Sequence, residues 1–326
     1  MKVSEVSESS NPEIAFVIPA LNEERDIGQS LASIRRAMNG KYRYEIIVVD
    51  HGSRDRTAQI AFEAGAVVLA QRGGTIAGLR NRGVAQSRGA ILVFIDADVE
   101  LTEAWSRQFP DTLRELRSQP ALVTGSHCSA PVDGGWLERY WFRHFAGERN
   151  ASHVGTGHLI ITRAAFQSVG GFDENLETGE DYEFCRRVVR HGGTVHNNPA
   201  LEVIHRGFPS TLAEFVRREV WHGKGDLRSW ADYRASRVGI AATLFLLLHL
   251  LILISPFLGR AGGWIMASAV AGIAGLLLAS SLFKYGHSPW PVILVNAGVY
   301  YFYFVGRGLS VLAGLKNLLR ADSGDK

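Results

Sequence analysis

The sequence predicts an α/β fold with a mostly parallel sheet flanked by helices, followed by a C-terminal helical region that spans a membrane. Three observations support this prediction. Strand-like and helix-like segments alternate over the first hundred residues, polar residues follow the strand-like segments, and the composition becomes strongly apolar from Val238 onward. Alternation of strands and helices is typical of βαβ units, in which the strands run parallel.

Apolar runs in the first hundred residues have the length and composition of buried parallel strands. They are Ile14–Pro19, Tyr44–Asp50, Ala66–Ala70 and Ala90–Asp96. Between the first two runs, apolar residues recur on one helical face, at Ile27, Leu31, Ile34 and Met38. A glycine follows each of the three helix-like segments, where helices commonly end on a residue that tolerates positive φ. These glycines are Gly40, Gly65 and Gly89.

Polar residues come directly after three of these strands. Asn22-Glu23 follows the first strand, Asp50-His51-Gly52-Ser53 the second, and Asp96-Ala97-Asp98 ends the fourth. The carboxyl ends of parallel strands meet at one edge of an open sheet, where ligands bind. Carboxylate oxygens suit Mg²⁺ and Mn²⁺, which often bridge a carboxylate to a substrate phosphate. The last cluster therefore predicts a metal site, although two carboxylates in a turn are also typical of a solvated loop.

The order of these motifs resembles that of the family 2 glycosyltransferases, nucleotide-sugar-dependent enzymes with the GT-A fold. The resemblance covers roughly residues 14–225 and is carried by these segments: Ile14–Glu23, Ile46–Thr57, Arg80–Gly83, Phe94–Asp98, Gly170–Glu174 and Gly179–Asp181. It departs at His51, where the family usually has a second aspartate that faces the nucleotide base. The choice between uracil and guanine is therefore open.

The resemblance implies a role for each matching residue. The nucleotide would be held by Pro19, Ala20, Asn22, Glu23, Asp50, Arg80, Asn81, Asp96 and Ala97. A divalent cation, Mn²⁺ or Mg²⁺, would be bound by Asp98 with Asp96. Asp181 would be the general base, with Glu180 as the next candidate. His205, which ends the strand-like segment Ala200–His205, would be a third metal ligand or a histidine hydrogen-bonded at a strand end.

Asp181 begins the helix-like segment Asp181–His191, where the helix dipole favours a carboxylate, so simple capping is the alternative role. The buried face of this helix is expected to carry Tyr182, Cys185, Val188 and Val189. The segment Gly155–His158 precedes the strand-like Leu159–Thr162. Its glycines would allow the backbone to approach a sugar or a phosphate, and ordinary turn glycines fit the sequence nearly as well.

These groups predict an inverting transfer of a sugar from a nucleotide-diphosphate sugar to a lipid or lipid-linked acceptor. The departing diphosphate gains negative charge, which a divalent cation neutralises, and the attacking hydroxyl needs a base opposite the leaving group. A nucleotidyltransferase or another phosphate-handling enzyme is one alternative, but the chain has no G-x-x-x-x-G-K-[ST] loop. A non-catalytic membrane scaffold is another, and it would be expected to lack Asp96, Asp98 or Asp181.

The apolar C-terminal part predicts two or three membrane spans within residues 238–314. Val238–Ser255 and Gly263–Phe283 are long enough to cross a bilayer, whereas Pro291–Val305 is shorter, ends near Arg307, and could instead lie in the interface. An interfacial helix is expected before them. Its signs are a capping box, Thr211-x-x-Glu214, an apolar stripe, and basic and aromatic residues: Arg217, Arg218, Trp221, His222, Lys224, Arg228, Trp230, Tyr233, Arg234 and Arg237.

The expected organisation is a disordered N-terminus (1–13), a GT-A domain (14–225), a basic juxtamembrane segment (226–237), a transmembrane region (238–314) and a polar tail (315–326). No signal peptide is expected in residues 1–13, and the two cysteines fit a reducing cytoplasm. The basic segment places the catalytic domain on the cytoplasmic side of an inner cell membrane. The expected partners are the sugar donor, the acceptor and the membrane, with no nucleic acid. Basic residues in the tail also favour the cytoplasm, but three complete spans would place the tail on the opposite side of the membrane.

Overall fold

The structure is a computed structural model that describes residues 11–38, 40–142, 153–224 and 230–322. The chain forms two compact units, Met1–Pro131 with Phe145–Phe208, and Val132–His144 with Pro209–Lys326. Most of the predicted disordered N-terminus lies outside the described residues, and so does the predicted domain boundary between residues 225 and 226. The assignment of domains therefore stays a prediction at these points.

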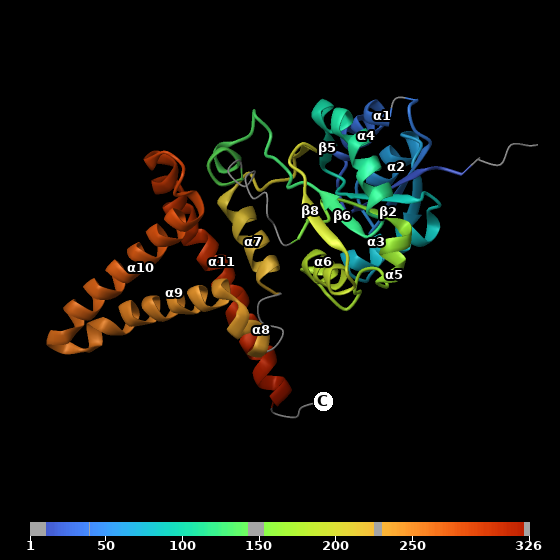
Figure 1. Ribbon diagram of the computed structural model, residues 1–326. Helices are drawn as coiled ribbons and strands as arrows, with labels where there is room; N and C mark the ends of the chain where they lie inside the picture. Colours follow the sequence, from blue (N-terminus) through green and yellow to red (C-terminus); the bar gives the residue numbers. More distant parts are fainter. Residues whose placement is uncertain (1–10, 39, 143–152, 225–229, 323–326) are drawn as a thin grey trace, which may run out of the picture. The chain divides into compact units, whose positions relative to one another are not determined.

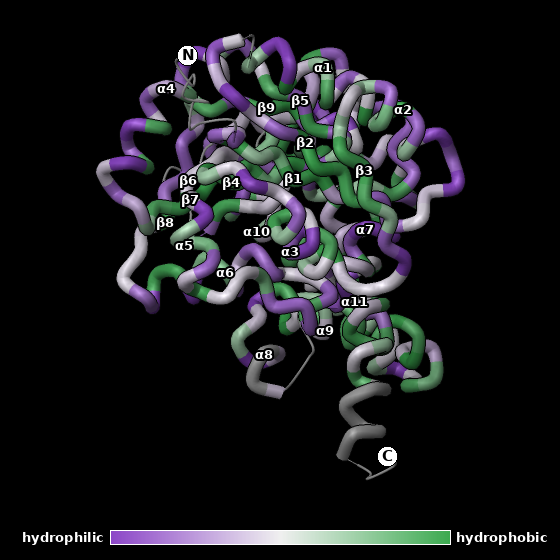
Figure 2. The backbone as a smooth tube through the Cα atoms, turned by 90° about the vertical axis from the view of Figure 1, so that its right-hand side faces the viewer, coloured by the Kyte–Doolittle hydropathy of each residue, from purple (hydrophilic) through white to green (hydrophobic). Residues whose placement is uncertain are grey.

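The first unit is built on a seven-stranded sheet with the strand order β3-β2-β1-β4-β7-β6-β8 (Figure 1). Its parallel half agrees with the prediction: β1 (Ile14–Ala20), β2 (Tyr44–Asp50), β3 (Val67–Ala70) and β4 (Ile91–Ile95). Figure 2 shows β1 and β2 as hydrophobic segments, as expected for strands that are covered on both faces. The mostly parallel α/β sheet is confirmed.

The other half of the sheet contains one reversed strand. This strand is β7 (His158–Thr162), which runs antiparallel to β4 and to β6 (Leu122–Gly125), while β8 (Thr194–Asn197) is parallel to β6. A separate two-stranded sheet pairs β5 (Val99–Leu101) with β9 (Val203–His205), and Val99 lies opposite His205. The predicted strand Ala200–His205 therefore exists but begins only at Val203.

Helices cover both faces of the large sheet. On one face, α1 (Ile27–Met38), α2 (Thr57–Glu63) and α4 (Glu103–Ser118) pack on alternate strand residues such as Phe16 and Val93. On the other face, α3 (Ile76–Gln86), α5 (Arg163–Ser168) and α6 (Glu180–Arg190) pack on residues such as Phe94. The predicted apolar stripe of α1 is buried along its length.

Two of the three predicted helix-ending glycines have the expected conformation. Gly40 and Gly65 have φ angles of 69° and 72°. Gly89 is required for a different reason, because a Cβ there would lie 2.4 Å from the backbone nitrogen of Ala15 in β1. The chain approaches the sheet too closely at this point for any side chain.

The second unit is helical. Its described residues form a π-helical turn, η1 (Glu138–Phe142), and the α-helices α7 (Leu212–Gly223), α8 (Trp230–Ala235), α9 (Arg237–Ile254), α10 (Gly262–Tyr285) and α11 (Trp290–Asp322). Short 3₁₀ turns lie at Ser255–Phe257 and Gly259–Ala261. Among the described residues, three segments are long and apolar enough to cross a membrane, Arg237–Phe257, Gly259–Tyr285 and Trp290–Leu315. Large apolar side chains on them face outward, including Leu253, Trp264 and Phe283. Such a surface indicates association with a membrane.

Helix α11 is longer than the apolar run Pro291–Val305 suggested. Arg307 does not end it, because its guanidinium pairs at 3.2 Å with the buried Glu219 of α7, and Glu219 also lies 3.3 Å from Arg218. Residues 315–322, predicted as a polar tail, continue the helix. The predicted capping box at the start of α7 is present.

Candidate active site

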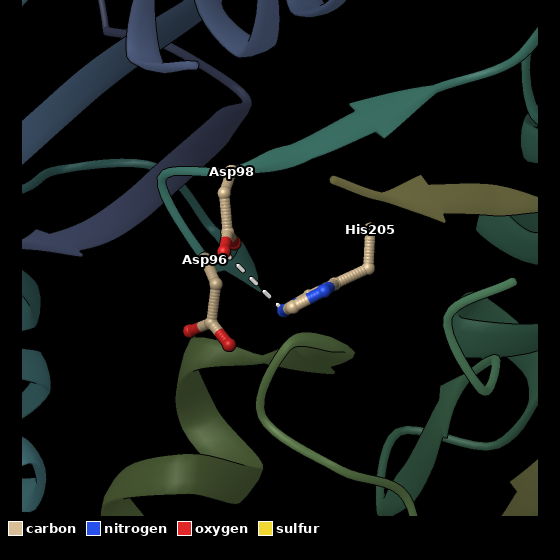
Figure 3. Close-up of side chains that lie close together, drawn as sticks. All are labelled: Asp96, Asp98 and His205. Atoms are coloured by element: carbon tan, nitrogen blue, oxygen red, sulfur yellow. Dashed lines mark ion pairs between the residues drawn. The ribbon is translucent and has the colours of Figure 1, made fainter. Parts of the chain in front are cut away.

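The two aspartates that follow β4 lie beside a histidine from the other end of the unit. Asp98 directly precedes β5, and the pairing of β5 with β9 places it next to His205. Asp96, Asp98 and His205 each offer one ligand atom, and these three atoms lie within 4.8 Å of one another (Figure 3). The His205 Nε2 atom is 3.4 Å from Asp98 Oδ2. The structure thus brings together the three predicted metal ligands.

The chemistry of this cluster fits a divalent cation. Asp98 Oδ1 and His205 Nδ1 are buried and have no hydrogen-bond partner among the described residues. Burial raises the pKa of Asp98, and the negative charge of Asp96 adds to this effect, while His205 opposes it. Two carboxylates and one imidazole are a set of ligands that suits Mn²⁺. Mg²⁺ prefers oxygen ligands, so it would be bound mainly by the two carboxylates. A bound cation would relieve the repulsion between the two carboxylates.

Glu23 belongs to the same electrostatic cluster. Burial raises its pKa from the ordinary value of 4.5 to about 8, and the negative charges of Asp98, Asp26 and Asp96 contribute. The backbone N–H of Glu23 donates to Thr57 Oγ1 at 2.7 Å, which fixes the residue after β1. The sequence pattern predicted a nucleotide contact for Glu23. It could not reveal that the Glu23 carboxylate lies close enough to Asp98 for the two negative charges to repel each other.

The Glu23→Gln variant is expected to be more stable than the wild type at pH 8 when no metal is bound. Because the pKa of Glu23 is higher in the folded protein, its contribution to stability is present at low pH and is lost as the pH rises from about 4.5 to about 8. Glutamine does not titrate, so the stability advantage of the variant should grow over this interval. Thermal unfolding in EDTA between pH 5 and pH 8.5 measures the difference; an advantage that does not change with pH would contradict the prediction.

A buried arginine connects the metal cluster to helix α6. Arg80, from α3, is almost completely buried, and its guanidinium lies 2.7 Å from Asp96 Oδ1 and 2.8 Å from Glu180 Oε1. Thr156 Oγ1 also donates to Glu180 Oε1, at 3.1 Å. The sequence pattern placed Arg80 on the nucleotide. The structure shows that Nη1 and Nη2 of its guanidinium each pair with a carboxylate of the protein, and a contact of Arg80 with a nucleotide stays a prediction.

Replacement of Arg80 by methionine is expected to destabilise the protein strongly. The buried Glu180 and the partly buried Asp96 would lose their counter-charge, and breaking a buried ion pair on one side typically costs about 3–5 kcal/mol. Adding Glu180→Gln to Arg80→Met should recover part of the loss, because one buried carboxylate is then neutral. Denaturant unfolding of the three proteins measures both effects, and a single-variant cost below about 1 kcal/mol would refute the network.

Glu180 and Asp181 have different surroundings at the start of α6. Glu180 is buried and engaged by Arg80, and burial raises its pKa while Arg80 opposes the shift. Asp181 is only partly buried, and its Oδ1 accepts a hydrogen bond from the backbone of Tyr182 at 2.7 Å. A Cβ at Gly155 would lie 3.6 Å from Asp181 Oδ2, so the backbone passes close to this oxygen. Of the two carboxylates, Asp181 is the more accessible.

The glycine-rich segment before β7 belongs to the site. A Cβ at Gly157 would lie 3.1 Å from Asp96 Oδ2 and 3.4 Å from Cys128 Sγ. The buried His158 ends this segment; Trp105 Nε1 donates to its Nε2 at 2.8 Å, and burial lowers its pKa to about 3, so the ring is neutral and structural. The backbone of residues 155–157 therefore runs between the metal cluster and Asp181.

The loops after β1 and β2 hold each other in place. Asn22 has a φ of 57°, its N–H donates to Ser53 Oγ at 2.9 Å, and its Oδ1 accepts from Arg54 N at 2.9 Å. The Asp50 carboxylate accepts hydrogen bonds from the backbone of Gly52 and Ser53. Both residues thus shape the loop at the sheet edge, and their contact with a nucleotide stays a prediction.

The remaining predicted nucleotide residues lie at this edge or behind it. Pro19 and Ala20 end β1, and Ala97 is buried between the two aspartates. Asn81 is occupied elsewhere: its Nδ2 donates to Phe172 O at 2.9 Å, and its Oδ1 accepts from Phe172 N at 3.0 Å. Asn81 therefore holds the loop at residues 170–174 against α3, and its contact with a nucleotide stays a prediction.

The buried face of α6 differs from the prediction. Cys185 and Val188 are buried, together with Phe184, but Tyr182 is 47% exposed and Val189 is 52% exposed. The apolar pattern did not distinguish the two sides of this short helix.

Comparisons with known proteins agree with this architecture. The profile of the Glycosyl transferase family 2 matches residues 15–170, and that of the N-terminal domain of galactosyltransferase matches residues 141–207. The glycosyltransferase AglE of Haloferax volcanii is 27% identical over 242 residues, which are 70% of this chain and 77% of that protein. The pre-mycofactocin glycosyltransferase of Mycobacterium tuberculosis is 26% identical over 66% of this chain, and the match spans 47% of that relative's length. An undecaprenyl-phosphate 4-deoxy-4-formamido-L-arabinose transferase of Pseudomonas fluorescens is 34% identical over 118 residues, 33% of this chain and 32% of that protein.

Among solved structures, the mannosyltransferase PcManGT from Pyrobaculum calidifontis in complex with GDP-Man and Mn²⁺ aligns with a TM-score of 0.52 and 16% identity, over 95% of this chain and 87% of that chain. At this identity the likeness concerns the fold. It confirms the predicted GT-A-type sheet followed by apolar helices. Residues 15–170 form a glycosyl transferase family 2 domain, and the protein is a glycosyltransferase of that family.

Proposed function

We propose that this protein is an inverting, metal-assisted glycosyltransferase that moves a sugar from a nucleotide-diphosphate sugar to a lipid-linked acceptor at a membrane. The observation that carries the proposal is the bridge made by Arg80 between Asp96 and Glu180. It links the carboxylates suited to a divalent cation with the first turn of α6, where Asp181 lies. The name of one relative, an undecaprenyl-phosphate 4-deoxy-4-formamido-L-arabinose transferase, includes a lipid phosphate, which supports an acceptor that carries a lipid.

In this proposal Asp98, Asp96 and His205 hold Mn²⁺ or Mg²⁺, which would neutralise charge on the departing nucleoside diphosphate. Asp181 accepts the proton of the acceptor hydroxyl as its oxygen attacks the anomeric carbon. The bond from that carbon to the phosphate oxygen breaks, and the nucleoside diphosphate leaves with the electron pair. Attack from the face opposite the leaving group inverts the anomeric configuration. The N-terminal end of α6 favours the ionised carboxylate that this step needs.

The donor side is expected to use the loops after β1 and β2. Asn22 and Asp50 hold these loops in shape, and His51 stands where relatives usually carry an aspartate toward the base. The His51 Nδ1 atom is buried without a hydrogen-bond partner among the described residues, which makes it available to a base. A nucleotidyltransferase or a scaffold is disfavoured, since the family assignment names a transferase of sugars and all three aspartates are present.

The test uses the purified full chain in membrane lipid with Mn²⁺ and a panel of nucleotide sugars. We expect one donor to release its nucleoside diphosphate only when lipid extract is present, and NMR of the product to give the inverted anomer. The Asp98→Asn variant is the matched control for release that does not depend on the site. Absence of release with every donor, or retention of configuration, would contradict the proposal.

We also propose that the apolar helices cross the inner cell membrane and that the catalytic unit faces the cytoplasm, where nucleotide sugars are made. Arg217 and Arg234 precede the first span, and each basic residue near an anionic surface contributes about 1 kcal/mol. His222 does not add to this charge, because burial, together with Arg218 and Arg307, lowers its pKa to about 3.

This orientation predicts that the catalytic unit is protected in spheroplasts. Protease added from outside should leave the segment up to Phe208 intact, and it should cut that segment after the membrane is permeabilised with detergent. A periplasmic protein and a cytoplasmic protein serve as the digestion controls. Cleavage of this unit in sealed spheroplasts would overturn the proposed topology.

A further inference from the structure

Aromatic rings form a row beside Asp181. Tyr182 follows Asp181 on α6, and its ring stays 47% exposed. The His153 ring meets it edge-on, with centroids 5.6 Å apart, and the His127 ring lies 6.5 Å from that of His153. The guanidinium of Arg186 is 5.7 Å from the centre of the Tyr182 ring. An exposed tyrosine held in this way offers a fixed apolar surface at the edge of the site.

The same stretch of backbone touches both the row and the proposed base. His153 packs against Tyr182, and two residues later Gly155 lies beside Asp181, where a Cβ would be in van der Waals contact with Oδ2 at 3.6 Å. Asp181 and Tyr182 therefore both contact the short segment from residue 153 to residue 155. The acceptor must supply a group that reaches Asp181, because Asp181 is proposed to take its proton.

The charges around Asp181 favour an uncharged nucleophile. The segment from residue 173 to residue 183 carries six carboxylates: Asp173, Glu174, Glu177, Glu180, Asp181 and Glu183. Arg80 pairs with Glu180 and Arg187 with Glu183, and the charge of Arg187 also acts on Asp173. A phosphate nucleophile would be repelled by Asp181 and needs no base, because it is already ionised. A hydroxyl is neutral and needs one.

We infer that the acceptor presents a neutral sugar ring, the terminal saccharide of a lipid-linked glycan, which stacks on Tyr182 while one of its hydroxyls donates its proton to Asp181. This inference rests on the proposed function and names the acceptor class for the same site. The C–H face of a sugar ring is apolar and matches the face of an aromatic ring, while its hydroxyls remain at the ring edge. Tyr182 is then a residue that determines acceptor specificity. In the transfer step, the acceptor oxygen bonds to the anomeric carbon, the proton passes to Asp181, and the nucleoside diphosphate leaves with its electron pair.

The experiment compares two kinds of acceptor with the purified full chain, Mn²⁺ and the active donor. One set consists of dodecyl β-glycosides of glucose, galactose, mannose and N-acetylglucosamine; the other acceptor is undecaprenyl phosphate. We expect transfer to at least one alkyl glycoside. Tyr182→Leu should raise KM for it about 10-fold with a smaller change in kcat, and Tyr182→Phe, which keeps the ring, should restore KM to within about 2-fold of the wild type. Val189→Ala, on the exposed side of α6, is the surface control.

The outcomes separate this inference from the proposed function. Transfer to undecaprenyl phosphate with all the glycosides inert would overturn the inference and leave the glycosyltransferase proposal standing. Equal KM values of the alkyl glycoside for Tyr182→Leu, Tyr182→Phe and the wild type would exclude stacking of the acceptor sugar on the Tyr182 ring. Donor turnover that no glycoside in the panel accelerates would also count against it. Absence of nucleoside diphosphate release from every donor would instead refute the proposed function itself.

Discussion

Replacement of Asp98 by asparagine is expected to abolish sugar transfer while leaving the fold intact. The variant keeps the shape of the side chain but removes one of the two carboxylates that converge with His205. A cation that neutralises the departing diphosphate lowers the activation barrier by several kcal/mol. Loss of the cation should therefore reduce kcat/KM by at least about 10²-fold. The unfolding free energy should not fall, because burial and the negative charge of Asp96 already raise the pKa of Asp98 and disfavour its ionised form.

The measurement combines nucleoside diphosphate release at saturating Mn²⁺ with thermal unfolding. Asp26→Asn is the matched control, because Asp26 contributes negative charge to the same cluster but is not among the three residues that converge. We expect this control to retain most of its activity. Excess EDTA should reduce the wild type to the level of Asp98→Asn, and added Mn²⁺ should restore only the wild type. Full turnover of the wild type in excess EDTA would exclude a metal role.

The parallel half of the sheet could be predicted because its information is local. The runs that form β1, β2 and β4 are apolar throughout, which is what a strand covered on both faces requires, and their polar ends mark the sheet edge. The direction of β7 could not be predicted in the same way. A buried strand has the same composition whether it runs parallel or antiparallel, and only its register with Ile91–Ile95 reveals the reversal.

The site was predicted residue by residue but not as a network. Asp96 and Asp98 were predicted as metal ligands, and His205 as a third ligand or as a histidine hydrogen-bonded at a strand end; the structure brings the three together. One of the two carboxylates that Arg80 binds, however, is Glu180, one hundred positions later in the chain, and no spacing rule connects the two. The pairing became visible only when the fold brought α3 and α6 together.

The length of α11 illustrates the same limit. A charged residue after an apolar run normally indicates the end of a span, and Arg307 was interpreted in this way. The interpretation was wrong because the counter-charge, Glu219, comes from a helix about ninety residues earlier. A hydropathy pattern contains no information about such a distant partner.

Asparagine at position 181 is expected to slow transfer by about 10²–10⁴-fold, the usual cost of losing a positioned base. Asparagine has nearly the same shape as aspartate but cannot accept a proton at neutral pH, so the loss should appear in kcat. The affinity for nucleoside diphosphate should stay unchanged, because the residues that converge as metal ligands are Asp96, Asp98 and His205. Calorimetry with the nucleoside diphosphate and Mn²⁺, alongside initial rates, separates the two effects.

Glu183→Gln is the matched control for Asp181→Asn, because it removes one negative charge from the same turn of α6, where Glu183 pairs with Arg187. If the acidity of this turn were the only requirement, the two variants would lose similar activity. If Asp181 is the base, only Asp181→Asn should lose most of its kcat. Transfer at the wild-type rate by Asp181→Asn would remove the assignment. Glu180 is a poor replacement in that case, because it is buried and its carboxylate is already held by Arg80 and Thr156.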